Sequence, residues 1–209
     1  LPPEKALREL ADSYLYKDVL EIEGVRKSAV LQKLLTALAL QVGSEASYNE
    51  LSKTVGIDSK TVEKYIDILE KCFIVFRLDS YSRNIRTELT KGKKIYFCDL
   101  GIRNAILNNF APLETRSDVG ALWENFFIME RMKYNHYADR AVKSYFWRTT
   151  DKQEIDYVEE SNGELHLFEI KWNAKRQNTR FPNLFVNTYQ PAHTDVVTPE
   201  NYLTMLIHV

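Results

Sequence analysis

The chain has 209 residues, of which 44% are hydrophobic and 27% are charged, and its formal net charge is -1 at pH 7. This composition is that of a globular protein with one large or two small cores, and it excludes a disordered or collagen-like chain. Because the net charge is close to zero, any nucleic-acid surface has to be a local patch of basic residues.

Cysteine and histidine are too sparse to indicate a disulfide framework or a zinc site. Cys72 and Cys98 are far apart in the sequence, and a chain of this size needs no bridge between them, although one could form. The four histidines show no zinc-site spacing. No apolar run approaches the ~18 residues of a membrane span. We therefore expect a cytoplasmic protein with reduced thiols and no membrane contact.

The first segment, LPPEKALRELADSYLYKDVLE, combines two prolines with apolar residues at helical spacing. The chain begins with Leu1 rather than methionine. We expect residues 1–24 to be a linker helix that follows a module missing from this chain.

Three helices are predicted next. Residues 28–42 carry an apolar stripe. In the following segment, EASYNELSKTVGIDSKTVEKYIDILEKC, Ser47 begins a capping-box pattern, Gly56 ends one helix, and Asp58 or Ser59 caps the next. Two short helices joined by a tight glycine turn are the layout of a helix-turn-helix.

Two β-rich segments, FIVFRLDSY and KKIYFCDL, follow and enclose a basic loop. A helix-turn-helix followed by a two-stranded ribbon is a winged helix, which we predict for residues 25–112. The loop, or wing, has a single acid, Glu88. Its basic residues are Arg83, Arg86, Lys91, Lys93 and Lys94.

The second helix of the pair has no excess of positive charge. Its lysines and acids are Lys60, Lys64 and Lys71 with Glu63, Asp67 and Glu70. That balance is poor for phosphate contact, so we expect the wing to contact DNA instead. Winged helices also serve as protein-binding modules, and a lysine-rich loop can be simply solvated.

From residue 113 onwards the pattern changes to one long helix followed by strands. SDVGALWENFFIMERMKYNHY has Leu122, Phe126, Met129 and Met132 on one side of a helix. Four strand candidates follow, namely KSYFWRT, QEIDYVEE, GELHLFEIKW and HTDVVTP. We therefore predict an α/β domain over residues 113–209, and an α+β chain as a whole.

The Asn-Gly pair at 162–163 predicts a two-residue type I′ hairpin. In that register Asp156 faces Glu169, and Glu154 faces Lys171. Two facing carboxylates on an apolar surface require a proton or a cation between them. Mg²⁺ favours one or two carboxylates, and a nearby lysine can stabilise phosphate charge or orient an attacking water. This pattern predicts a metal-dependent site with Asp156, Glu169 and Lys171 as catalytic residues.

The same hairpin allows a non-catalytic interpretation. Lys171 could simply neutralise Glu154, and Glu169 could lie at a solvated sheet edge. A register slip or a bulge would also undo the pairing of the two carboxylates.

An acid on a helix, an aspartate on one strand and Glu-x-Lys on the next are similar to the core of the PD-(D/E)xK nucleases. The matching residues are Glu124 in GALWENFFIME, Asp156 in EIDYV, and Glu169 and Lys171 in FEIKW. The chain departs from the motif at Ile155, where the family has proline. The resemblance implies a restriction-endonuclease-like fold for residues 113–209.

A closer resemblance rests on ALWENFFIMER, FWRTTDKQEIDYV and LFEIKW, preceded by SYLYKDV and KIYFCDLGIRNAIL. These segments resemble the C-terminal region of bacterial and archaeal AAA+-type ATPases, which is catalogued as a domain of unknown function, DUF 4143. The resemblance implies that Glu124, Asp156 and Glu169 bind Mg²⁺ or Mn²⁺ and that Lys171 is the catalytic lysine. It also implies an ATPase module as partner, with ATP and any homo-oligomer contacts in that missing module. The P-loop pattern G-x-x-x-x-G-K-[ST] does not occur in this sequence.

A second basic segment, KWNAKRQNTR, follows the predicted site and contains no acid. Its Lys175, Arg176 and Arg180 are expected to hold a DNA backbone beside the metal. The sequence therefore predicts a DNA-directed, metal-dependent phosphodiesterase domain of an AAA+-type ATPase. The alternative is an inactive nuclease-fold module that binds DNA or a partner protein for the ATPase.

Overall fold

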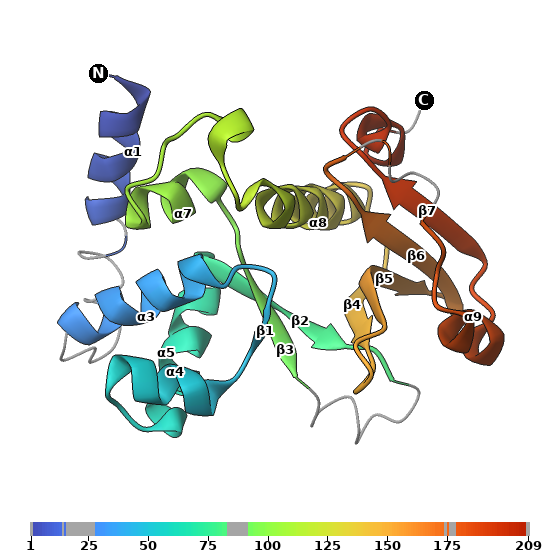
Figure 1. Cartoon of the computed structure of the whole chain (residues 1–209), viewed down its shortest axis with the longest axis horizontal. Helices are drawn as coiled ribbons and strands as arrows, with labels where there is room; N and C mark the ends of the chain where they lie inside the picture. The colour runs from blue at the N-terminus through green and yellow to red at the C-terminus, as the bar shows by residue number, and fades with distance from the viewer. Residues whose placement is uncertain are drawn as a thin grey trace. The chain divides into compact units, whose positions relative to one another are not determined.

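The structure is a computed structural model. It describes residues 2–13, 15, 28–82, 92–173, 175 and 179–207. Within these residues lie seven α-helices and a seven-stranded, mostly antiparallel sheet, so the chain is a mixed α+β protein (Figure 1).

The chain forms two compact units. Unit 1 comprises Leu1–Arg77 and Lys93–Arg116. Unit 2 comprises Leu78–Gly92 and Ser117–Val209. The predicted linker at residues 1–24 includes a described helix, α1 (Pro3–Asp12), while residues 16–27 lie outside the described part of the chain.

Unit 1 is mainly helical. Helix α1 packs against α7 (Leu100–Ile106) so closely that a Cβ on Gly101 would lie 2.8 Å from Leu7 Cδ2. A larger residue at position 101 would require the side chains of Leu7 and Asp99 to move. Asp99 caps α7, as its place after a strand indicates, by accepting a hydrogen bond from the Ile102 N–H at 2.8 Å.

Helix α3 (Ser28–Leu40) confirms the predicted apolar stripe. The buried residues of the stripe are Leu31, Leu34, Leu35, Leu38 and Val42. Helix α3 packs against α4 (Tyr48–Val55), which begins the predicted helix pair.

The turn chemistry of the helix pair is as predicted. Ser47 Oγ accepts a hydrogen bond from the Glu50 N–H at 3.3 Å, and Gly56 ends α4 with a φ of 79°. Asp58, rather than Ser59, caps α5 (Ser59–Lys71) by accepting from the Thr61 N–H at 2.9 Å. The buried stripe of α5 includes Val62, Tyr65, Ile66 and Leu69.

Three strands accompany these helices in the order β1-β3-β2. They are β1 (Glu45–Ala46), β3 (Lys93–Phe97) and β2 (Val75–Ser80). The predicted wing between β2 and β3 falls largely on residues 83–91, which lie outside the described residues. A short 3-10 helix, η2 (Leu113–Thr115), ends the unit.

Unit 2 contains the long helix and the strands predicted after residue 113. Its elements are α8 (Val119–Tyr137), β4 (Lys143–Arg148), β5 (Glu154–Ser161), β6 (Glu164–Ile170), α9 (Asn183–Tyr189), β7 (His193–Val197) and η4 (Tyr202–Met205). The strand order is β2-β4-β5-β6-β7, where β2 contributes its residues 78–80 (Figure 1). Strand β2 is parallel to β4, β7 is parallel to β6, and the other pairs are antiparallel.

The β5–β6 hairpin has the predicted register. Its pairs run from Ser161↔Glu164 to Tyr157↔Phe168. Asn162 and Gly163 form the turn, and both have positive φ, as a type I′ turn requires. The Asn-Gly pair therefore correctly predicted which side chains share a face of the β5–β6 hairpin.

The two faces of the hairpin pack against different helices. Val158, Leu165 and Leu167 form a cluster with Phe185 of α9. On the other face, Phe168 contacts Phe127 of α8, with ring centroids 5.7 Å apart.

The predicted apolar side of α8 was only partly right. Leu122 is buried, but the other three predicted residues, Phe126, Met129 and Met132, are only partly buried. The buried side instead continues through Phe127, Ile128, Arg131 and Asn135. An apolar stripe does not reveal this buried side of α8, because Arg131 and Asn135 are polar.

Cys72 and Cys98 are not joined by a disulfide. Across the described ranges, no helix combines the length and the apolar character needed to cross a lipid bilayer.

Candidate active site

The site begins where the β5–β6 ladder opens. The last residue pair of the ladder is Tyr157↔Phe168. Beyond it, the Asp156 side chain is the hydrogen-bond acceptor in place of a backbone carbonyl, since its Oδ2 accepts from the Ile170 N–H at 2.7 Å. The next residue, Lys171, continues the parallel pairing with β7 through its N–H, which donates to the Val197 carbonyl at 2.8 Å. The carboxylate of Asp156 is therefore fixed at the end of β6.

Lys171 joins the two acids. Its Nζ lies 2.9 Å from Asp156 Oδ2 and 2.6 Å from Glu169 Oε2. The three side chains are mostly buried, with 13%, 7% and 22% of Asp156, Glu169 and Lys171 exposed. We call these three residues the acid–lysine cluster.

Burial and like charge act strongly on Glu169. Burial first, and then the charge of Asp156, raises the pKa of its carboxyl to about 7, although Lys171 acts in the opposite direction. Burial acts to lower the pKa of Lys171, but the charges of Asp156 and Glu169 outweigh it and raise that pKa. The ammonium is thus held charged between the carboxylates.

Each carboxylate keeps one oxygen outside this pairing. Within the described residues, Asp156 Oδ1 and Glu169 Oε1 accept no hydrogen bond. Mg²⁺ is usually held by one or two carboxylates, with water and phosphate oxygens completing its octahedron. The donor set of the cluster therefore fits a hard divalent cation.

The third predicted metal ligand is Glu124. It lies on α8 beside Trp123, whose ring contacts Trp172 with centroids 5.8 Å apart. No three His, Cys, Asp or Glu side chains in the described part of the chain are grouped as metal ligands. The structure therefore brings Asp156 and Glu169 together but does not group Glu124 with them.

The partner of Lys171 differs from the register-based expectation. The non-catalytic interpretation paired Lys171 with Glu154. Instead, Glu154 lies 3.8 Å from Arg148, and Lys171 turns to Asp156 and Glu169. The pairing of Glu154 with Lys171 assumed that the β5–β6 ladder continues to these residues. The ladder instead ends at Tyr157↔Phe168, where the Asp156 side chain accepts the next backbone hydrogen bond.

The predicted nucleic-acid contacts are only partly described. Lys175 and Arg180 are exposed, and Lys93 is partly exposed. Lys94 lies in β3 with 2% of its surface accessible, so its ammonium does not face solvent. Four predicted contacts, Arg83, Arg86, Lys91 and Arg176, lie outside the described residues.

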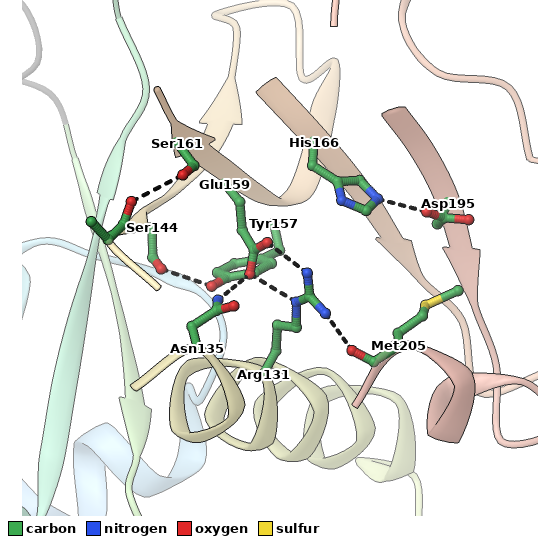
Figure 2. A network of polar contacts seen from close by, with 10 residues as sticks. Arg131, Asn135, Ser144, Tyr157, Glu159, Ser161, His166, Asp195 and Met205 are labelled. Atoms are coloured by element: carbon green, nitrogen blue, oxygen red, sulfur yellow. Dashed lines mark hydrogen bonds and ion pairs between the residues drawn. The ribbon is translucent and has the colours of Figure 1, made fainter. Parts of the chain in front are cut away.

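A second polar cluster in unit 2 was not predicted (Figure 2). Glu159 receives two parallel hydrogen bonds from Arg131, Nε to Oε1 and Nη2 to Oε2, each 2.9 Å long. Asn135 Nδ2 donates to Glu159 Oε1 at 2.6 Å, and Arg131 also bonds the Met205 carbonyl. This network joins α8 to β5 and to η4. The spacing of the sequence could have indicated this network, because Arg131 and Asn135 are four residues apart and lie on the same side of α8 as Phe127.

Two further polar pairs flank this network (Figure 2). The buried Tyr157 hydroxyl lies 2.7 Å from Ser144 Oγ, and burial raises its pKa well above the ordinary value. His166 Nε2 lies 2.6 Å from Asp195 Oδ2. Burial lowers the pKa of His166, with Asp195 acting in the opposite direction.

Comparison with known proteins gives relatives in bacteria and an archaeon. An uncharacterized protein of Mycobacterium tuberculosis is 28% identical over 213 residues, covering 95% of this chain and 47% of the relative. A second, from Haemophilus influenzae, is 23% identical and covers 87% of this chain and 44% of the relative. A third, from Methanocaldococcus jannaschii, is 28% identical over 56% of this chain and 25% of the relative. No solved structure matches the chain.

The chain spans about half the length of the first curated relatives that it matches. Two family models cover almost all of it. Residues 119–206 match the model described as Domain of unknown function (DUF4143), which confirms that part of the resemblance seen in the sequence. Residues 3–113 match a different model, and the chain therefore belongs to the family described as Domain of unknown function (DUF8612).

Proposed function

We propose that unit 2 is a DNA-directed phosphodiesterase domain that depends on Mg²⁺ or Mn²⁺ and uses the acid–lysine cluster as its centre. One observation carries this proposal. A single ammonium contacts carboxylates from two neighbouring strands, and one oxygen of each carboxylate lies outside this contact. Such an arrangement holds negative and positive groups together where a phosphate and a cation would both be stabilised.

Asp156 and Glu169 would hold the cation through their remaining oxygens. The cation would supply electrostatic stabilisation to the phosphate and acidify a water. Lys171 Nζ can donate to a phosphate oxygen, and Glu169 can exchange a proton near neutral pH because its pKa is about 7. Glu124 is proposed as an additional acid that acts only when substrate is bound.

The DNA contacts in this proposal come from basic residues near the cluster and in the wing. Lys175 and Arg180 follow the cluster in sequence and are exposed. We also propose that residues 25–112 act as a winged helix. The greater length of the relatives supports a further region in the full protein, which we propose to be the ATPase module.

Isothermal titration of Mn²⁺ and Mg²⁺ into the chain and into Asp156→Ala tests the cation site. We expect the wild type to bind and the variant to lose binding, because Asp156 supplies one of two carboxylates. Glu160→Gln removes a partly exposed acid from the same strand and should bind like the wild type. Glu124→Gln should also bind the cations like the wild type in this titration, because Glu124 is proposed to act only when substrate is bound.

Hydrolysis of end-labelled DNA then tests the chemistry. With Mg²⁺ present, cleavage by the wild type should disappear in both Asp156→Ala and Lys171→Met. If a folded wild-type chain binds neither cation, or if cleavage persists in Asp156→Ala, the proposal is wrong.

A second candidate function is favoured by the position of Lys171 itself. Its ammonium already neutralises both carboxylates, as a purely structural ion pair would. On this view the domain binds DNA or a partner protein without catalysis. DNA binding that is unchanged by EDTA, in a chain that neither binds the cations nor cleaves DNA, would favour this second function.

A further inference from the structure

The exposed face of α5 has a different charge balance in the structure from the one its composition indicates. Asp67 and Glu70 count among the acids that offset its lysines in the sequence. In the structure both are engaged by Arg77 of β2. Arg77 Nη1 lies 2.7 Å from Asp67 Oδ1, and its Nε donates to Glu70 Oε2 at 2.9 Å.

Arg77 contacts both carboxylate oxygens of Glu70. The Arg77 N–H also donates to Glu70 Oε1 at 2.9 Å, and its Nη2 forms a further ion pair with Oε2. Bidentate, charge-assisted pairs of this kind hold carboxylates in a fixed orientation. Two of the three acids on α5 are therefore held in ion pairs by Arg77, whose single positive charge offsets one of their two negative charges.

The cations of α5 itself are three lysines, and with Arg77 they leave a net charge of +1 against the three acids of the helix. Lys60, Lys64 and Lys71 are exposed, and within the described residues they form no ion pair. At 3.6 residues per turn these positions fall within about 40° of one another around the helix. We call this set the α5 lysine stripe. Glu63 is the exposed acid that remains on the helix.

The stripe suits a polyanion with closely spaced charges. Its ends are 11 positions apart, which is about 16 Å along the axis at 1.5 Å per residue. Duplex DNA carries one negative charge per ~1.7 Å of its axis, and its major groove admits an α-helix. In helix pairs joined by a tight turn, the second helix is the one that enters this groove.

We propose that the α5 lysine stripe is a binding surface for duplex DNA, and that Arg77 favours this binding by holding the carboxylates of Asp67 and Glu70 in ion pairs. This surface belongs to unit 1 and does not depend on the acid–lysine cluster. It also reverses the expectation that the helix is too balanced in charge to contact phosphate.

The first test is fluorescence anisotropy with a labelled duplex in EDTA, so that neither a cation site nor hydrolysis is needed. The triple variant Lys60→Gln, Lys64→Gln and Lys71→Gln should bind more weakly than the wild type. Its plot of log K against log salt should be shallower by about 2.7, because three phosphate contacts contribute roughly 0.9 each. A matched control removes three exposed lysines elsewhere, Lys33, Lys143 and Lys152, and should leave that slope unchanged.

The second test targets Arg77. Arg77→Met should weaken duplex binding, because it releases two carboxylates beside the stripe. Adding Asp67→Asn and Glu70→Gln to that variant should restore binding, although no positive charge is regained. A thermal melt of each variant shows whether it is folded.

Two results would overturn the proposal. One is wild-type affinity and salt slope in the triple glutamine variant. The other is a failure of the neutral substitutions at Asp67 and Glu70 to restore binding in a folded Arg77→Met chain. Either result leaves the proposed chemistry of unit 2 untouched, since that is measured by cation titration and cleavage.

Discussion

Glu169 is the residue at which burial and charge oppose each other most directly. Burial and the charge of Asp156 raise its pKa to about 7, compared with 4.5 for an unperturbed glutamate. Between these pH values the folded chain holds a proton that the unfolded chain has released. Its contribution to stability is therefore present below the unfolded pKa and is lost as the pH rises through the folded pKa.

Glu169→Gln should show this pH dependence, since glutamine imitates the protonated carboxyl. We expect the variant and the wild type to differ little in unfolding free energy at pH 5. Above pH 7 the variant should become the more stable of the two, because only the wild type then has to bury a second negative charge beside Asp156. Urea unfolding at pH 5 and pH 8 measures the difference. An unchanged difference across this range would mean that Glu169 is not protonated in the folded chain, and Glu160→Gln serves as the control.

At the scale of elements, the buried pair Arg131–Glu159 is the main polar connection between α8 and β5. The two side chains are only 6% and 3% exposed, so removal of one partner leaves the other as a buried, unpaired charge. Arg131→Met should therefore cost about 3–5 kcal/mol of unfolding free energy. The double variant Arg131→Met, Glu159→Leu should recover most of this loss, because it removes the orphaned carboxylate as well.

Urea unfolding of the single and double variants checks this prediction. Equal stability of the two variants would contradict it, because the unpaired charge of Glu159 would then carry no cost. The exposed pair Lys133–Glu130 on the same helix is the control, since its loss should be worth less than about 1 kcal/mol.

The sequence predicts correctly the features that depend on residues close together in the chain. The caps at Ser47 and Asp58 and the turn at 162–163 depend on neighbouring residues alone, and each has the predicted geometry. The buried side of α8 could not be predicted in the same way. Arg131 is buried because Glu159, 28 residues away, supplies its partner.

In the candidate site, too, the features set by the hairpin could be predicted, and those set by contacts between side chains could not. The hairpin register predicted Asp156 and Glu169 on one face, and in the structure both carboxylates contact Lys171 Nζ. The sequence did not show that the Asp156 carboxylate would replace a ladder bond and draw Lys171 away from Glu154. It also could not show that Arg77 would engage two acids of α5, because that contact depends on how β2 packs against the helix.

At the scale of the whole molecule, the two proposals assign different tasks to the two units. Unit 1 would contribute binding energy through the α5 lysine stripe, and unit 2 would contribute the chemistry through Asp156, Glu169 and Lys171. Binding that is equal in the ground state and the transition state lowers KM without changing kcat. The two units should therefore affect different kinetic constants.

Steady-state cleavage of one duplex substrate with Mg²⁺ separates these tasks. The triple glutamine variant of Lys60, Lys64 and Lys71 should raise KM and leave kcat within about twofold of the wild type, because we expect its phosphate contacts to be equally strong in the ground state and the transition state. Lys171→Met should lower kcat, since its ammonium stabilises charge that develops at the reacting phosphate. A triple variant that lowers kcat at saturating DNA would mean that the stripe also positions the substrate for reaction. The two units could then no longer be assigned separate tasks.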